Sequence, residues 1–158
     1  MTNFKKILLY ERQAEEKGFA IIIGVDEAGR GPLAGPVVAA AVALREFDFQ
    51  NRVGDSKQLS PLQREKAFHE ILTKSHVGVG IMNESIIDSI NVLQATYLAM
   101  SQAVQNLTRR LPVSTRKRKI FLLVDGNQFK TELPYAYQTI VNGDALSLSI
   151  GCASIVAK

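Results

Sequence analysis

Residues 24–32 read Gly24-Val25-Asp26-Glu27-Ala28-Gly29-Arg30-Gly31-Pro32, directly after the apolar run Ala20-Ile21-Ile22-Ile23. The run is rich in β-branched residues, which predicts a buried strand. Two adjacent acids at its end are unusual, because Asp and Glu are rarely buried unless they are paired or bind a metal. The glycines around Arg30 allow the backbone to approach a ligand closely. The stretch therefore predicts a strand that carries two carboxylates into a tight loop suited to holding divalent metal and phosphate.

The composition is that of an ordinary globular domain. The chain has 158 residues, of which 46% are hydrophobic and 22% are charged, enough for one domain with its own core. The formal net charge of +4 permits a nucleic-acid partner without requiring one. Cys152 is the only cysteine, so an internal disulfide is excluded and a reducing, cytoplasmic compartment is expected. No apolar segment reaches the roughly 18 residues of a membrane-spanning helix, so no membrane partner is expected.

Apolar patterns and chain breakers divide the sequence into alternating strands and helices. Strands are expected at residues 20–25, 36–44, 76–82, 120–124 and 138–141. Helices are expected at 4–17, 61–74, a pair ending at Pro112, and 146–158, with a basic loop at 115–119. The first two strands are expected to form a hairpin because their linker is short. This alternation predicts an α/β domain, a mixed sheet with helices on both faces.

Four acids come just after predicted strands, namely Asp26, Glu27, Asp125 and Asp144. In such sheets the functional crevice lies beyond the carboxyl ends of strands, so we expect these side chains to converge. Converging carboxylates repel one another and raise each other's pKa, and divalent cations that prefer oxygen ligands relieve the conflict. Two such ions about 4 Å apart can activate water and stabilise the leaving oxygen of a phosphodiester. Asp55 is expected to stay outside this set, with a turn or ion-pair role beside Lys57.

Other interpretations of these residues remain open. Taken alone, the Asp26-Glu27 pair is a solvated strand end. The segment 29–34 formally fits the G-x-G-x-x-G/A fingerprint of dinucleotide-binding proteins, although its prolines suit a loop and strand better than a helix. The basic segment 116–119 would suit a nucleic-acid binder without catalysis, or simply a solvated loop.

Several blocks of this sequence resemble ribonuclease HII, the type 2 ribonuclease H family. The first is GVDEAGRGPLAGPVV at 24–38, and the second is DSKQL at 55–59. The blocks VDGN at 124–127 and GD at 143–144 are similar to those that hold the family's remaining acids. The block ASIVAK at 153–158 is similar to the helix motif that follows them. The resemblance spans roughly residues 18–158.

The resemblance implies a ribonuclease H-like five-stranded mixed sheet and a single catalytic domain over residues 1–158. It implies an endonuclease that hydrolyses the RNA strand of RNA–DNA hybrids and nicks 5′ of ribonucleotides embedded in duplex DNA, producing 5′-phosphomonoesters with Mg²⁺ or Mn²⁺. A cytoplasmic monomer that removes ribonucleotides during DNA replication is the expected setting. The implied catalytic metal ligands are Asp26, Glu27, Asp125 and Asp144. The implied substrate-binding residues are Gly29, Arg30 and Gly31, which would read the 2′-hydroxyl and its phosphate, and Lys57, which would contact the nucleic-acid backbone.

The sequence departs from the family in its length. Family members continue past the ASIVAK helix, and their further helices and a junction-recognising tyrosine would lie beyond Lys158. We expect the terminal helix to lack neighbours for Ile150, Ile155 and Val156, and Asp144 to be poorly held as a result. A catalytically weak nucleic-acid-binding domain of the same fold is therefore the alternative function.

Overall fold

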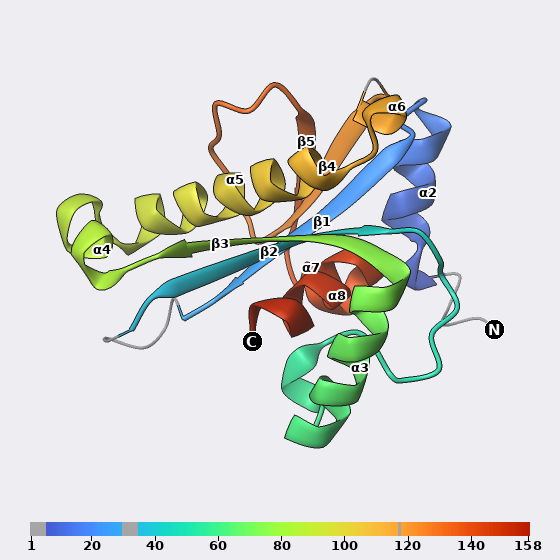
Figure 1. The fold of residues 1–158 in the computed structure, drawn as a ribbon, viewed down its shortest axis with the longest axis horizontal. Coiled ribbons are helices and arrows are strands. Elements are labelled where there is room, and N and C mark those ends of the chain that lie inside the picture. The colour runs from blue at the N-terminus through green and yellow to red at the C-terminus, as the bar shows by residue number, and fades with distance from the viewer. Residues whose placement is uncertain (1–5, 30–34, 117) are drawn as a thin grey trace.

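The structure is a computed structural model that describes residues 6–29, 35–116 and 118–158. Five strands form one sheet in the order β3-β2-β1-β4-β5 (Figure 1). They are β1 (Ile21–Ala28), β2 (Val37–Leu44), β3 (Ser75–Met82), β4 (Ile120–Asp125) and β5 (Ala136–Ile140). β2 is antiparallel to β1 and β3, whereas β4 is parallel to β1 and β5. The carboxyl ends of β1, β4 and β5 therefore share one edge of the sheet.

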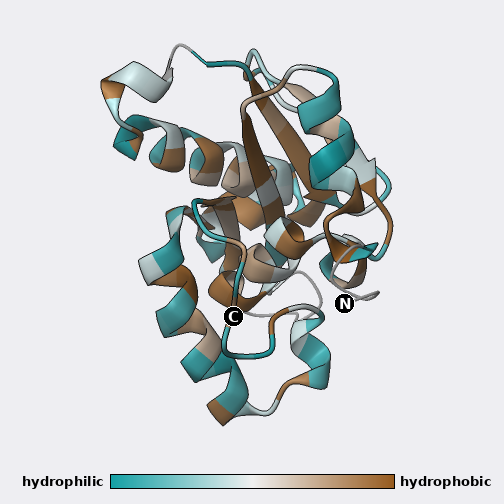
Figure 2. Cartoon of the chain, turned by 90° about the vertical axis from the view of Figure 1, so that its right-hand side faces the viewer, coloured by the Kyte–Doolittle hydropathy of each residue, from teal (hydrophilic) through white to brown (hydrophobic). Residues whose placement is uncertain are grey.

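Helices cover both faces of this sheet, as expected. Figure 1 shows α5 along one face and α8 with α3 on the other, and Figure 2 shows the hydrophobic strands enclosed between helices with polar outer surfaces. The longer helices are α2 (Leu9–Glu16), α3 (Pro61–Lys74), α4 (Glu84–Ile90), α5 (Val92–Arg110) and α8 (Leu148–Ala157). The short ones are η1 (Ser56–Gln58), α6 (Val113–Arg116) and α7 (Gly143–Leu146). No helix in the described ranges is long and apolar enough to span a membrane.

Helix α5 packs closely on the sheet through an apolar face. Met100, Val104 and Leu107 are almost completely buried against the strands. A Cβ at Gly80 of β3 would lie only 2.0 Å from the Ala99 carbonyl oxygen, so glycine allows this close approach. This close packing sets the distance between α5 and the strand ends that carry the acids.

Helix α3 starts at the predicted residue. Ser60 accepts a hydrogen bond from the Gln63 backbone at 3.1 Å, and the Gln63 side chain accepts one from the Ser60 backbone at 2.9 Å. This reciprocal capping box, with Pro61 in the first turn, satisfies backbone donors that a helix start leaves free. The cap also fixes the end of the turn at 55–59.

Some predicted boundaries were wrong. β1 runs three residues further than expected, because its ladder with β2 continues to Ala28 opposite Val38. Asp26 and Glu27 therefore lie inside the strand. Helix α6 occupies part of the expected basic loop, and Asp144 lies in the helical turn α7.

The expectation of an unsupported terminal helix was also wrong. Nine of the ten residues of α8 are buried within the described chain. Ile150 packs against Phe121, Leu123 and Ile140, and Ile155 belongs to the cluster on the α3 side of the sheet. A Cβ at Gly24 of β1 would meet the Ser149 carbonyl carbon at 2.2 Å, so α8 lies directly on the strand. The helix that follows Asp144 is therefore held by residues that precede it in the chain.

Candidate active site

The two adjacent acids of β1 lie on opposite faces of the sheet, because successive strand residues alternate. Asp26 is 5% exposed and is within hydrogen-bonding reach of Ser154 on α8. Glu27 lies on the α5 side, where it lines a hollow of about 350 Å³ with Thr96, Tyr97 and Asp125. Continuation of the strand past Val25 is what gives the two carboxylates these separate directions.

Asp125 lies between the other acids. It ends β4, the parallel neighbour of β1, and its negative charge raises the pKa of both Asp26 and Asp144. Its Oδ1 accepts a hydrogen bond from the backbone N–H of Gly143 at 2.7 Å. A Cβ at Gly143 would lie 2.7 Å from Ile150 Cδ1 on α8 and 3.2 Å from Asp125 Oδ1, so glycine lets α7 approach both α8 and the end of β4. This bond brings Asp144 to the edge where β1 and β4 end.

The electrostatics of this edge are those of unneutralised carboxylates. Burial raises the pKa of Asp26 to about 9, and the charges of Asp125 and then Glu27 act in the same direction. Hydrogen bonds from the Glu27 backbone and from Ser154 offset only part of that rise. Burial, followed by Asp125 and Asp55, raises the pKa of Asp144 as well. The carboxylates at this edge therefore repel one another, and an external cation would relieve that repulsion.

Asp55 joins this edge, which the sequence analysis did not foresee. Its expected turn role is confirmed, because its Oδ1 accepts a hydrogen bond from the Lys57 backbone at 3.0 Å and caps η1. Its carboxyl group also hydrogen-bonds that of Asp144. The signal was present in the sequence, since the 55–59 block resembles a family block as clearly as the acid-bearing ones do.

Lys57 is brought to the same place by the same turn. It is exposed, and its positive charge lowers the pKa of Asp144 against the larger effects that raise it. The side chain therefore lies within electrostatic range of the acid edge, which is the edge of the sheet formed by Asp26, Glu27, Asp125 and Asp144. That position is compatible with the expected contact to a nucleic-acid backbone.

The loop that follows β1 is described at only one of its expected substrate-binding residues. Gly29 has φ +87°, and a Cβ there would lie 2.4 Å from the Pro36 carbonyl oxygen. Glycine is therefore required by the fold at this position, whatever the loop binds. Arg30 and Gly31 lie outside the described residues.

Mg²⁺ or Mn²⁺ fits the chemistry of the carboxylates at this edge. The donors are hard oxygens, and the raised pKa values of Asp26 and Asp144 indicate that a positive charge is lacking beside them. In the described part of the chain, no group of three or more His, Cys, Asp or Glu side chains is arranged to hold an ion by itself. Water and substrate phosphate would therefore complete the coordination, as Mg²⁺ sites commonly require.

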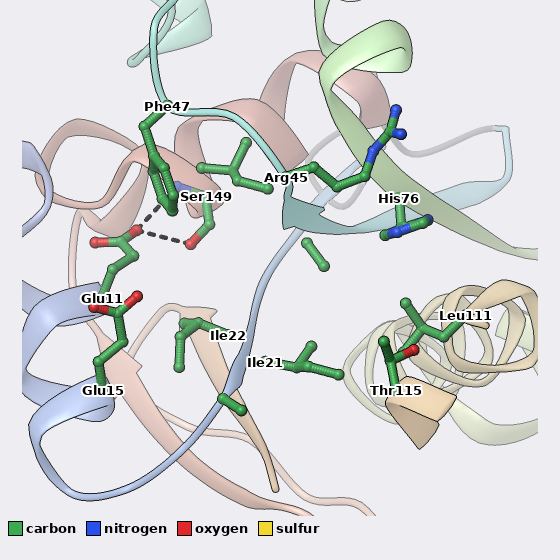
Figure 3. A pocket seen from close by; sticks show the side chains of 13 residues that line it. Glu11, Glu15, Ile21, Ile22, Arg45, Phe47, His76, Leu111, Thr115 and Ser149 are labelled. Atoms are coloured by element: carbon green, nitrogen blue, oxygen red, sulfur yellow. Dashed lines mark hydrogen bonds between the residues drawn. The ribbon is translucent and has the colours of Figure 1, made fainter. Parts of the chain in front are cut away.

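The basic segment 116–119 and a cavity lie at the opposite edge of the sheet. The Lys119 carbonyl oxygen accepts backbone hydrogen bonds from Ala20 and Ile21 just before β4 begins, about 20 Å from Asp125 at roughly 3.3 Å per strand residue. The basic segment therefore does not border the acids. A cavity of about 260 Å³ lies at that same edge, lined by Glu11 and His76 among others (Figure 3).

Glu11 is a structural anchor beside that cavity. Its Oε1 accepts hydrogen bonds from the Ser149 backbone at 3.0 Å and the Ser149 hydroxyl at 2.8 Å (Figure 3). It also accepts one from the Ser147 hydroxyl at 2.5 Å. These donors belong to the start of α8, where backbone N–H groups otherwise lack partners. The N-terminal helix α2 thus holds one end of α8, and the acid edge lies at the other end.

The dinucleotide interpretation of 29–34 is wrong. That fingerprint requires a helix after the glycines and a parallel return strand. Here β1 and β2 are antiparallel neighbours in register from Ile23 opposite Ala43 to Ala28 opposite Val38. A hairpin of this kind leaves no place for the crossover helix.

The fold is that of the ribonucleases H. A crystal structure of the ribonuclease H2 from Pyrococcus horikoshii OT3 matches with a TM-score of 0.68 and 26% identity, covering 87% of this chain and 70% of that one. A crystal structure of Bst-RNase HIII in complex with Mn²⁺ matches with a TM-score of 0.67 at 16% identity, covering 91% of this chain and 52% of that one. The second match is a likeness of fold alone.

The sequence assigns the chain more narrowly. The family model described as Ribonuclease HII matches residues 23–158. The ribonuclease HII of Syntrophus aciditrophicus (strain SB) is 47% identical over 150 residues, which is 94% of this chain. The chain belongs to the ribonuclease HII family. It spans 66% of the length of that relative, and 59% and 62% of two others.

Proposed function

We propose that this chain is a metal-dependent ribonuclease H that hydrolyses the RNA strand of RNA–DNA hybrids and nicks 5′ of ribonucleotides embedded in duplex DNA. The observation that carries the proposal is the position of Asp125 between Asp26 and Asp144, where its charge raises the pKa of both. Structural carboxylates are ordinarily paired with donors or cations, so accumulated negative charge at a strand edge favours a cation-binding role. Membership of the ribonuclease HII family supports the same conclusion.

The proposed metal ligands are Asp26, Glu27, Asp125 and Asp144. When bound, Mg²⁺ or Mn²⁺ supplies Lewis-acid chemistry for phosphodiester hydrolysis. The chain's own contribution is to hold carboxylates from β1, β4 and α7 at one edge before substrate arrives. The Gly143 hydrogen bond to Asp125 and the packing of α8 support that preorganisation.

Substrate recognition is proposed for the residues that flank the acids. The turn of Lys57 offers a cation for a backbone phosphate, and the loop from Gly29 through Gly31 is proposed to read the 2′-hydroxyl. A 2′-hydroxyl both donates and accepts a hydrogen bond and distinguishes RNA from DNA, so exposed backbone groups suit its recognition. Gly29 is compatible with this role, because a glycine backbone can approach a ligand closely.

A cleavage assay on three duplexes of one sequence tests the proposal. The substrates are an RNA–DNA hybrid, a DNA duplex with one ribonucleotide and an all-DNA duplex, each with Mg²⁺, Mn²⁺ or a chelator. The expected result is metal-dependent cleavage of the first two, with a 5′-phosphate at the nick, and none of the third. Tight binding of the hybrid without cleavage under any metal condition would instead establish the alternative, a nucleic-acid-binding domain without catalysis.

A further inference from the structure

A chain of hydroxyl groups connects Asp26 to the turn that carries Asp55 and Lys57. Ser154 on α8 hydrogen-bonds the Asp26 carboxylate, and its Oγ lies 2.8 Å from Ser56 Oγ in η1. Lys158 Nζ donates to the same Ser56 oxygen. Ser56 is 0% exposed and Ser154 is 2% exposed, so water does not compete for these bonds.

The direction of the hydrogen bonds follows from the number of donors. When Asp26 is ionised, as a cation ligand must be, its carboxylate can only accept, so Ser154 uses its single O–H on Asp26. Ser56 must then donate its own O–H to the Ser154 oxygen, and Ser56 accepts from the Lys158 ammonium. Each hydroxyl therefore donates toward Asp26, and hydrogen bonds aligned in this way strengthen one another.

Asp26 holds few other partners. Its Oδ1 accepts from the Glu27 backbone at 2.8 Å, which leaves the second oxygen dependent on contacts outside β1. Rotation about the Cβ–Cγ bond would change the position of that oxygen. Ser154 restrains the rotation from α8, the helix that immediately follows Asp144 in the chain. The same hydroxyl thus connects the Asp26 carboxylate of β1 to α8.

We propose that Ser154 and Ser56 are positioning residues that preset the Asp26 carboxylate for a divalent cation and fix the Lys57 turn to the same framework. The inference rests on the proposed function, because it assigns Asp26 to the metal site. Neither serine touches substrate or metal in this scheme. Ser154 acts through Asp26, and Ser56 acts through Ser154 and through the turn that it begins.

The test compares Ser154→Ala and Ser56→Ala with a matched control, Ser101→Ala. Ser101 Oγ also lies 2.8 Å from another hydroxyl, that of Thr131, but this pair joins α5 to the 126–135 segment away from the Ser154 chain. The first readout is Mn²⁺ binding without nucleic acid, followed through the electron paramagnetic resonance signal of free Mn²⁺. The second is kcat and KM on the duplex with one ribonucleotide, and the third is the thermal unfolding midpoint.

Ser154→Ala is expected to weaken Mn²⁺ binding and lower kcat by about tenfold each, the loss typical of a hydrogen bond to a charged group, with KM little changed. Ser56→Ala is expected to weaken Mn²⁺ binding less and to raise KM, because it frees the Lys57 turn. The double variant should fall short of the product of the two single effects, since the residues act in series. Ser101→Ala should resemble the wild-type chain in every readout except a small change in thermal unfolding.

Two outcomes would overturn the inference. Wild-type cleavage and Mn²⁺ binding in Ser154→Ala would refute the positioning role and leave the proposed function standing. Equal losses in Ser154→Ala and Ser101→Ala would show that any lost hydroxyl pair has this effect. If the wild-type chain binds Mn²⁺ but does not cleave, the function fails while the binding comparison still decides the inference. If Ser154→Ala unfolds, Ser56→Ala decides it on the same readouts.

Discussion

Glu70 and Asp26 are both shielded carboxylates, and their surroundings push their pKa values in opposite directions. Glu70 on α3 accepts hydrogen bonds from the Gln50 backbone at 2.6 Å and from the Asn51 backbone and side chain at 2.9 and 2.7 Å, with Lys74 3.0 Å away. Burial raises the pKa of Glu70, but these donors outweigh it and bring the pKa to about 2. Burial and the charges of Asp125 and Glu27 instead raise the pKa of Asp26 to about 9.

The difference distinguishes a carboxylate that stabilises the fold from one whose surroundings favour a bound cation. The partners of Glu70 are already part of the chain, and they fix the 46–51 segment to α3. At the acid edge, negative groups face one another and the balancing charge must come from outside. Substitutions at Glu70 and at the acid edge test this contrast.

The largest effect is expected from Asp125→Asn. Asp125 borders both Asp26 and Asp144, so its loss removes the central ligand of the proposed metal site. Cleavage of the RNA–DNA hybrid should fall by about a thousandfold or more, with Mn²⁺ binding weakened in parallel. Single-turnover cleavage and calorimetric metal titration measure the two effects.

The control for Asp125→Asn is Glu70→Gln, which removes a negative charge at the other kind of carboxylate. It should cleave like the wild-type chain, because Glu70 borders none of the acids at the strand edge. Unchanged Mn²⁺ affinity in Asp125→Asn would remove the acid edge from consideration as the metal site.

Asp26→Asn is expected to raise the stability of the chain. The folded-state pKa of Asp26 is raised above its unfolded value of 3.8, so its contribution is present below pH 4 and is lost as pH rises toward about 9. Neutralising the side chain removes that loss, so the unfolding midpoint at pH 8 should rise by several degrees. Mn²⁺ should raise the midpoint of the wild-type chain and not that of the variant. A lower midpoint for Asp26→Asn at pH 8 would mean that this carboxylate is not strained by its neighbours.

The approximate positions of the strands and the hairpin of β1 with β2 could be predicted because they depend on local patterns. Alternating β-branched runs, the short linker before β2 and the Ser60-Pro61 cap each specify their element within a few residues. The ends of strands depend instead on a partner elsewhere in the chain. Val38 keeps Ala28 in the ladder, so Asp26 and Glu27 were predicted beyond a strand that in fact contains them.

The acid edge could be predicted in its members but not in its neighbours. Asp125 and Asp144 follow apolar runs, which is a local signal. The contact of Asp55 with Asp144 joins residues 89 positions apart, and no periodicity reports such a contact. The support of α8 was misjudged for the same reason, since Ile150 packs against strands that come earlier in the chain.

A smaller stability effect is expected from Glu70→Gln. The folded pKa of Glu70 is lowered from 4.5 to about 2, so its contribution is present above pH 4.5 and is lost as pH falls toward 2. At pH 7 the variant should unfold about 2–4 °C below the wild-type chain, as expected for a loss near 1 kcal/mol. The gap should close as both chains are acidified from pH 4.5 toward 2. A gap that stays constant over this range would point to packing rather than charge.

The smallest effect is expected from Lys57→Gln, which tests whether this lysine beside the acid edge contacts the substrate. Lys57 is exposed, so stability should stay within about 0.5 kcal/mol of the wild-type value. Loss of one phosphate contact should weaken hybrid binding a few-fold at low salt and reduce the slope of log affinity against log salt by about 0.9. Lys119→Gln is the matched control, an exposed lysine at the opposite edge of the sheet. If the slope changes in Lys119→Gln and not in Lys57→Gln, the nucleic acid binds at the basic segment and the acid edge is not where it docks.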